Sequence, residues 1–308
     1  MKRRDFLAAG AAAGAAVAVA GAESSAKADH HEKKGGFKLK YAPHFGMFRH
    51  SAGEDPVDQL KFAADQGFTA WEDNGMMGRP VDEQQRIADT MEKLGMEMGV
   101  FVSFSGFGKD RFVTDTSKAF HDELRERGKK VVETAQRVRA RWSTVVPGNV
   151  SQRIEFDYQM ANCIENLRVL ADICEQIEHT MVLEPLNWWA NHPGLFLTKV
   201  PQAYLICKGV DSPSCKILDD LYHQQITEGN LIPNIDKAWD EIGYFQVGDN
   251  PGRKEPYTGE INYQNVFRHI YKKGYKGIIG MEHGNSQPGP EGEMKVIEAY
   301  RKADAFEV

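Results

Sequence analysis

Several sequence signals that mark other protein classes are absent from this chain of 308 residues. None of its four cysteines forms a C-x-x-C pair of the kind that binds metal ions. No G-x-G-x-x-G follows the first expected strand, so a dinucleotide-binding fold lacks its usual mark. An excess of basic residues is also missing, since 44 Asp and Glu outnumber 38 Lys and Arg. Because an acidic chain repels a phosphate backbone, nucleic acid is a poor partner.

The cysteines are expected to be structural. Cys163 and Cys174 lie eleven residues apart on one expected helix, and Cys207 and Cys215 flank a turn from helix to strand. Buried free thiols are the preferred interpretation of all four. An oxidising compartment would also permit a disulfide between Cys207 and Cys215.

The chain begins with a segment that reads as an export signal. Residues 1–28 combine a basic head, a middle rich in Ala, Gly and Val, and small residues before an expected cleavage site. The RRDFL sequence at positions 3–7 is typical of signals for the twin-arginine export machinery, which predicts a periplasmic protein. An ordinary secretory signal or a membrane anchor is the alternative. A spanning helix is disfavoured, because the apolar middle is shorter than the roughly 20 residues that a bilayer requires, so no stable anchor remains after cleavage.

The rest of the chain is expected to be a short leader followed by one domain. Residues 29–36 are polar and end in glycine, which is typical of a flexible leader. Residues 37–308 are close in number to the roughly 250 of a single (β/α)₈ barrel. After residue 28 the chain carries 34 Lys and Arg against 42 Asp and Glu, a formal charge of −8.

Short apolar segments alternate with amphipathic helical segments eight times along this domain. The expected strands are at residues 39–43, 68–72, 97–104, 142–147, 181–187, 216–223, 244–250 and 277–284. The expected helices are at residues 57–66, 83–94, 116–138, 152–177, 199–208, 231–241, 263–273 and 292–305. This alternation predicts a parallel α/β sheet surrounded by helices, and eight repeats favour closure into a (β/α)₈ TIM barrel.

Four of the later strands end in side chains that carry oxygen. Glu184, Asp220, Gln246 and Glu282 are spaced by 36, 26 and 36 residues, which fits one strand and one helix per step. If the strands are parallel neighbours, these side chains meet at the C-terminal end of the barrel. Three adjacent carboxylates would take up protons unless a cation intervened. The pattern therefore predicts a shared site for a hard divalent metal ion.

Further polar residues at the strand ends are candidates for binding a substrate. They are His44, Glu72, Asn187, His223, Asp249, Asn250, Arg253 and His283. A lone polar residue at such a position more often caps the next helix or packs against a neighbour. For Arg253 the simpler alternative is an ion pair with Glu255 or Glu260 at the rim.

Three long motifs resemble the hydroxypyruvate isomerase family, which lies within the xylose-isomerase-like barrel superfamily. They are LEPLN at 183–187, DLYHQQITEGNL at 220–231 and QVGDNPGRKEPYTGEINY at 246–263. Weaker similarity includes ENLRVLAD at 165–172, so the resemblance covers roughly residues 162–284. The segments that follow the first two expected strands, residues 43–48 and 72–78, depart from the family pattern. The resemblance therefore does not identify the substrate.

The resemblance implies a metal-dependent active site. It implies that Glu184, Asp220, Gln246 and Glu282 bind one Mg²⁺ or Mn²⁺ ion, and that the two glutamates exchange protons with the substrate. His223 and Arg253 match family positions that hold substrate oxygens. Related ketose 3-epimerases carry histidine where this chain has Gln246, which favours the hydroxypyruvate isomerase branch. The superfamily often forms dimers or tetramers, so a homo-oligomer is possible.

The resulting hypothesis is an isomerase of a small α-hydroxy carbonyl compound, with hydroxypyruvate and tartronate semialdehyde as the substrate pair and an enediolate between them. One alternative is a sugar epimerase or an inosose-type dehydratase on the same barrel. Another is an exported carbohydrate-binding protein that keeps the metal ion but has lost turnover. A nuclease would need a histidine-rich cluster for several metal ions and a basic groove, and the sequence shows neither.

Overall fold

The computed structural model describes residues 36–308. The expected export signal at 1–28 and the leader up to residue 35 lie outside the described residues. Within the described part, nine parallel strands follow one another in the chain. They are β1 (Lys40–Ala42), β2 (Ala70–Trp71), β3 (Glu97–Met98), β4 (Val102–Ser105), β5 (Trp142–Val146), β6 (Thr180–Leu183), β7 (Cys215–Asp220), β8 (Ile242–Gln246) and β9 (Ile278–Gly280).

The strands form a parallel, TIM-barrel-like arrangement, which confirms the expected parallel α/β architecture. Seven strands are hydrogen-bonded in the order β1-β9-β8-β7-β6-β5-β4, and β2 pairs with β3. A single parallel bridge between His44 and Glu72 connects the ends of β1 and β2. The C-terminal ends of all these strands therefore face the same side, where a site built from strand exits can form.

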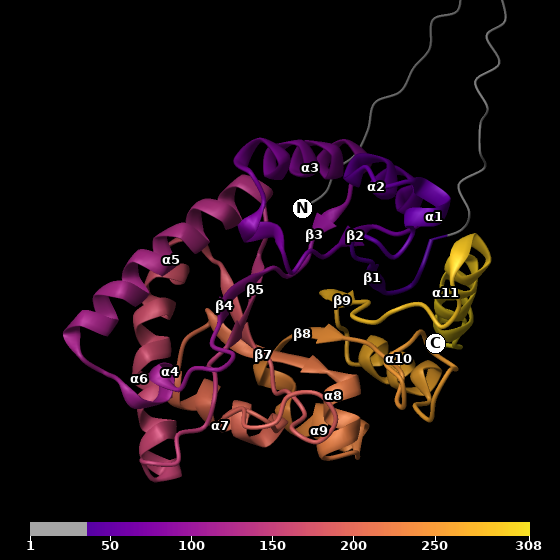
Figure 1. Cartoon of the computed structure of the whole chain (residues 1–308). Helices are drawn as coiled ribbons and strands as arrows, with labels where there is room; N and C mark the ends of the chain where they lie inside the picture. The colour runs from indigo at the N-terminus through magenta and orange to yellow at the C-terminus, as the bar shows by residue number, and fades with distance from the viewer. Residues whose placement is uncertain (1–35) are drawn as a thin grey trace, which may run out of the picture. The chain divides into compact units, whose positions relative to one another are not determined.

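Long helices lie outside the strands, as Figure 1 shows. They are α2 (Pro56–Asp65), α3 (Val81–Leu94), α5 (Lys118–Val138), α6 (Phe156–Cys174), α7 (Val200–Val210), α9 (Leu231–Ala238), α10 (Tyr263–Lys272) and α11 (Gly289–Asp304). Each begins and ends within a few residues of an expected helix. Shorter helices that the sequence did not predict are α1 (Arg49–Ala52), α4 (Arg111–Thr114) and α8 (Leu221–Thr227). None of the helices between residues 36 and 308 is long and apolar enough to cross a membrane.

Several predicted strands differ from the structure: those at 181–187, 244–250 and 277–284 end early, at Leu183, Gln246 and Gly280, and two others differ for local reasons. The expected strand at 97–104 is divided into β3 and β4, because β3 pairs with β2 whereas β4 pairs with β5. The chain changes partner near Gly99, whose backbone approaches the Tyr244 hydroxyl so closely that a Cβ would collide with it. The expected strand at 216–223 stops at Asp220. Its side chain accepts hydrogen bonds from the next backbone N–H groups and begins α8 as an N-cap.

An apolar cluster fills the interior between the strands. Its buried members are Ala42, Ala70, Val100, Val182, Leu218, Tyr244 and Ile278. Side chains alternate between the two faces of a strand, so a residue two positions after an interior residue also faces inward. This rule places Glu184, Asp220 and Gln246 in the interior, directly after the apolar cluster. Glu72 follows Ala70 with the same spacing.

All four cysteines are buried and free. This agrees with the preferred interpretation of the sequence, and the permitted disulfide between Cys207 and Cys215 is not formed.

Candidate active site

Three predicted carboxylates and one histidine meet at the C-terminal ends of the strands. Glu184, Asp220, His223 and Glu282 each contribute one possible ligand atom, and these atoms lie within 4.8 Å of one another. Gln246 ends β8 and lies beside Asp220 in the register of β7 and β8. Its side chain is buried, and none of the residues that the structure describes donates a hydrogen bond to its Oε1 atom.

The donor set fits a hard divalent cation. Glu184, Asp220 and Glu282 supply carboxylate oxygens, and Gln246 supplies a carbonyl oxygen that accepts no hydrogen bond from the described part of the chain. A buried acceptor without a donor is costly, because it loses its hydration without a replacement. Oxygen ligands of this kind are those that Mg²⁺ and Mn²⁺ prefer. The residues present therefore fit the divalent ion that the family resemblance implies.

Arg253 is the cation that contacts these carboxylates. Its Nη2 donates to Glu282 Oε2 at 2.6 Å and to Asp220 Oδ2 at 3.2 Å. Its Nε donates to the Glu282 carbonyl oxygen at 3.1 Å, which fixes the plane of the guanidinium. The simpler alternative, a rim ion pair with Glu255 or Glu260, is wrong for the described residues. The Glu255 carboxylate accepts instead from Ser286, and that of Glu260 from Asn250 and Gln225.

The positive charge of Arg253 does not neutralise the carboxyl groups of the site. Burial, together with repulsion from Glu282 and Asp220, raises the pKa of Glu184 well above its ordinary range. Burial likewise raises the pKa of Glu282 to about 7, although Arg253 opposes it. Burial would raise the pKa of Asp220 too, but His223 and Arg253 outweigh it and the pKa is lowered. One guanidinium thus leaves two carboxyl groups with a high proton affinity, which a divalent cation would reverse.

His223 is oriented as a hydrogen-bond donor toward the carboxylates. The backbone N–H of Asn187 donates to its Nδ1 at 3.2 Å, and the Asn187 side-chain Nδ2 lies 2.7 Å from the same atom. The side-chain amide of Asn187 cannot be flipped, because its Oδ1 accepts hydrogen bonds from the backbone N–H groups of Ala190 and Asn191. Since Nδ1 accepts, the proton of the neutral ring lies on Nε2. Burial lowers the pKa of His223 to about 4, so the ring is neutral near pH 7.

In this tautomer His223 is not one of the expected metal ligands. Its Nε2 lies 3.6 Å from Asp220 Oδ2 and 3.9 Å from Glu184 Oε1, and it has no hydrogen-bond partner within residues 36–308. An N–H group cannot donate a lone pair to a metal ion, but it can donate a hydrogen bond to a substrate oxygen. The arrangement suits the substrate-binding role that the resemblance implied.

The first two strand exits line a cavity beside Glu282. Its volume is about 200 Å³, and its lining residues are His44, Phe45, Glu72, Asp73, Asn74, Gly75 and Glu282. Asn74 was not among the predicted site residues, and its Nδ2 donates to Glu282 Oε1 at 2.9 Å. The ring nitrogens of His44 both face backbone carbonyls, those of Phe45 and His283. His44 thus lies at the edge of the cavity, and whichever ring nitrogen carries the proton can donate to a backbone carbonyl oxygen.

Three other predicted candidates maintain the loops around the site. The Asp249 carboxylate accepts from the backbone N–H groups of residues 250, 259 and 261. The Asn250 side chain donates to Glu260, and His283 Nε2 lies 2.9 Å from the Tyr300 hydroxyl. None of these three side chains belongs to the group of possible metal ligands in the described part of the chain.

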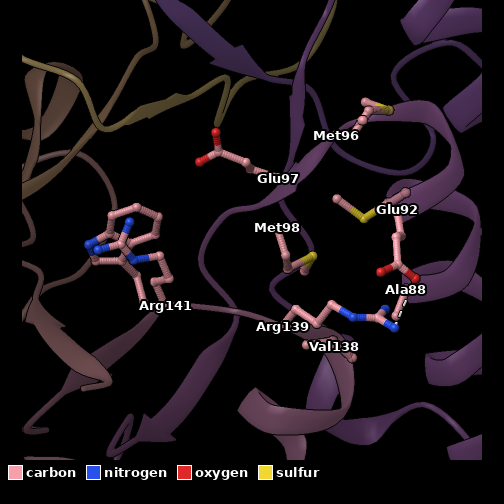
Figure 2. A pocket seen from close by; sticks show the side chains of 11 residues that line it. Ala88, Glu92, Met96, Glu97, Met98, Val138, Arg139 and Arg141 are labelled. Carbon is pink, nitrogen blue, oxygen red and sulfur yellow. Dashed lines mark ion pairs between the residues drawn. The ribbon is translucent and has the colours of Figure 1, made fainter. Parts of the chain in front are cut away.

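A second cavity, shown in Figure 2, lies at the opposite ends of the strands. It has a volume of about 260 Å³ and is lined by Glu97, the first residue of β3, and Trp142, the first residue of β5. Methionines form much of its wall, and an ion pair of 3.0 Å joins Arg139 to Glu92 beside it. The N-terminal face of such barrels contributes to stability rather than to chemistry. The carboxylate site is therefore the candidate active site.

Comparisons with known proteins agree with this geometry. The family model described as xylose isomerase-like TIM barrel matches residues 60–303. Hydroxypyruvate isomerase from Escherichia coli (strain K12) is 36% identical over 141 residues, which cover 46% of this chain and 54% of that protein. 2-Oxo-tetronate isomerase from Cupriavidus necator is 34% identical over 134 residues, which cover 42% of this chain and 51% of that protein. The chain spans about half the length of these relatives.

A solved structure extends the comparison to the fold. The crystal structure of an AP endonuclease of family 2 from Brucella melitensis matches with a TM-score of 0.70 and 23% identity, over 82% of this chain and 96% of that chain. Likeness at this identity shows a shared fold alone. The family model covers most of the described residues, and the curated relatives confirm the resemblance found in the sequence motifs. The chain belongs to the xylose isomerase-like TIM barrel family.

Proposed function

We propose that this protein is a metal-dependent isomerase that converts hydroxypyruvate to tartronate semialdehyde, within a complete (β/α)₈ barrel formed by residues 37–308. The observation that carries the proposal is the convergence of two buried carboxylates, Glu184 and Asp220, and the half-buried Glu282 with the Oε1 atom of Gln246, which has no hydrogen-bond partner among residues 36–308. The relatives named hydroxypyruvate isomerase and 2-oxo-tetronate isomerase support the class of reaction.

The proposed reaction moves a proton between two adjacent carbons. A base removes a proton from the hydroxyl-bearing carbon to give an enediolate, the hydroxyl proton passes to the former carbonyl oxygen, and an acid returns a proton to the former carbonyl carbon. Glu184 and Glu282 are the groups proposed for these transfers, because both carboxyl groups reach the shared site and can take up and release protons. An Mg²⁺ or Mn²⁺ ion held by Glu184, Asp220, Gln246 and Glu282 would supply Lewis-acid stabilisation of the developing negative charge. His223 would donate its Nε2–H to a substrate oxygen.

Arg253 is proposed to bind the substrate carboxylate through its planar fork. We expect Arg253→Lys, which keeps the charge but loses the fork, to lower kcat/KM for hydroxypyruvate by about 10- to 100-fold, the value of a charge-assisted hydrogen bond. The measurement compares hydroxypyruvate with dihydroxyacetone, which has no carboxylate and should be affected far less. An equal loss for both substrates would show that Arg253 serves only to hold Asp220 and Glu282.

The proposal is tested by deuterium exchange. Purified protein, freed of metal and then supplied with Mg²⁺, is incubated in deuterated water with hydroxypyruvate and a panel of ketoses and inososes, and deuterium entering carbon is followed by NMR. Exchange with hydroxypyruvate supports the proposal. If every compound remains unexchanged while one of them binds, the protein is a non-catalytic binding protein.

A second candidate is an epimerase or dehydratase that acts on a larger sugar. Trp188 and Trp189 follow β6, stack on each other at 5.8 Å, and are 50% and 74% exposed. Their loop is joined to the site, because Asn187 contacts His223 and the His192 ring lies 5.4 Å from that of His223. Exposed aromatic rings beside a polar pocket suit the apolar face of a sugar ring. Exchange with a ketose or an inosose but not with hydroxypyruvate would favour this function.

We also propose that the chain is exported to the periplasm by the twin-arginine route, on the composition of residues 1–28. Replacing Arg3 and Arg4 with lysines should keep most of the protein in the cytoplasm, as measured by fractionation of cells and immunoblotting. Unchanged export of this variant would point to an ordinary secretory signal.

A further inference from the structure

Glu72 is a buried carboxylate of the strand exits that the family motifs do not include. It follows β2, faces the interior, and is 1% exposed. Its backbone N–H donates to the Pro43 carbonyl oxygen, which fixes its position beside β1. No salt bridge to a basic side chain is found for it within residues 36–308. A carboxylate placed in this way needs other polar partners.

Those partners are two donors on β8. Gln246 Nε2 lies 3.3 Å from each of the two Glu72 carboxylate oxygens, and the Tyr244 hydroxyl donates to Oε2 at 3.2 Å. All three side chains are buried. The contact between Glu72 and Gln246 crosses the barrel interior, because the two residues come from β2 and β8, which are not neighbours in the sheets.

The contact determines which end of the Gln246 amide faces the carboxylate cluster. An amide offers a donor at one end and an acceptor at the other. With Nε2 held by Glu72, Oε1 is directed away from Glu72 and is left without a donor. In the opposite orientation Oε1 would face the two Glu72 oxygens, which offer it no donor while the carboxyl group is ionised, and Nε2 would lose both of its acceptors. A metal ion accepts the carbonyl oxygen as a ligand but not the amide nitrogen.

The neighbouring strands leave space for this contact. Gly280 pairs with Gln246 in the register of β8 and β9, and a Cβ at Gly280 would collide with Glu72 Oε2 and lie 2.9 Å from Gln246 Cγ. A Cβ at Gly99 would collide with the Tyr244 hydroxyl and lie 3.2 Å from Glu72 Cβ. Two glycines from two different strand segments therefore accommodate one polar network.

We propose that Glu72 is a positioning residue that holds the Gln246 amide with its carbonyl oxygen toward the divalent metal ion. This inference rests on the proposed function, since it assumes the metal site. It differs from the role predicted for Glu72 by the sequence, which was direct contact with substrate. It also gives the β2 exit a function in a part of the chain where the family motifs are absent.

The test measures binding of Mn²⁺ by calorimetry and electron paramagnetic resonance, without any substrate. Glu72→Gln keeps the size of the side chain. Its amide N–H can donate to Gln246 Oε1, which would allow the side-chain amide of Gln246 to flip. We expect Mn²⁺ to bind this variant about 10- to 100-fold more weakly, the usual effect of losing a partner that orients a ligand. Tyr244→Phe is the matched control. It removes the other donor to Glu72 but leaves the Gln246 contact, and its affinity should stay within about threefold of wild type.

A double-mutant cycle separates orientation from charge. Gln246→Glu has oxygen at both ends and cannot be misoriented. If Glu72 orients the amide, Gln246→Glu should tighten Mn²⁺ binding at least about tenfold in the Glu72→Gln background and weaken it in the wild-type background, where two carboxylates would meet. An equal gain in both backgrounds would show a charge effect and overturn the proposal. So would wild-type affinity in Glu72→Gln. If the wild-type protein itself binds no Mn²⁺, the proposed metal site fails instead.

Discussion

Replacing Glu184 or Glu282 with glutamine is expected to abolish deuterium exchange into hydroxypyruvate while the protein remains folded. Each substitution removes a group proposed for proton transfer, and a positioned acid or base is typically worth about 10² to 10⁴ in rate. The rate should therefore fall at least about 100-fold in either variant, even at saturating Mg²⁺. Glutamine has the same shape and does not add a buried charge, so folding should be preserved.

The measurement is the NMR exchange assay, with circular dichroism as the check on folding. Glu298→Gln is the matched control, because Glu298 is exposed on α11, away from the strand exits. It should exchange deuterium at the wild-type rate. Near-normal exchange in Glu184→Gln or Glu282→Gln would reject the role of that residue in proton transfer. A variant that binds Mg²⁺ normally and yet fails to exchange would separate the chemical role from the ligand role.

The helices and the general position of the site could be predicted because their signals are local. The helix expected at residues 57–66 is found as α2 at Pro56–Asp65, since its apolar spacing and the Asp55 cap lie within one segment. The interior positions of Glu184 and Asp220 follow from strand alternation, which also needs only neighbouring residues. Where structure is set by the sequence nearby, a single chain is sufficient.

The remaining features depend on contacts between distant segments. Asp220 reads as a strand residue, and only its hydrogen bonds to the following N–H groups show that α8 begins there and brings His223 to the site. The sequence did not identify Asn74 as a site residue, because its partner Glu282 lies 208 residues later. The pairing of Glu72 with Gln246 spans 174 residues and requires the sheet to curve until the ends of β2 and β8 approach each other. Distances of this kind cannot be derived from residue spacing.

Binding of a divalent metal ion is expected to strengthen steeply as the pH rises from 5 to 8. The pKa of Glu282 is raised from 4.5 to about 7, and that of Glu184 is raised in the same direction. A metal ion must displace these protons before it can bind the carboxylates. At pH 5, two units below the pKa of Glu282, the apparent affinity should be about 100-fold lower than at pH 8 from this group alone, which is about 3 kcal/mol.

In the metal-free protein, the same titration lowers the stability of the folded state as the pH rises. A carboxyl group with a raised pKa stabilises the folded state most below its unfolded pKa of 4.5, and this contribution disappears as the pH rises through about 7. The increase in thermal midpoint on adding Mg²⁺ or Mn²⁺ should therefore be smaller at pH 5 than at pH 8, since a bound ligand adds RT ln(1 + [L]/Kd) to the free energy of unfolding. His223 does not reverse this trend, because its pKa of about 4 lies below the window.

Calorimetry in buffers of different ionisation enthalpy would count the protons released. About one or more should leave per Mn²⁺ bound at pH 6, where Glu282 is mostly protonated without metal, and the part of the release that comes from Glu282 should fall toward zero at pH 8 or above. In Glu282→Gln the release at pH 6 should drop by about one proton. An affinity that stays constant from pH 5 to 8, with no proton release, would mean that the ion does not bind to Glu184 and Glu282.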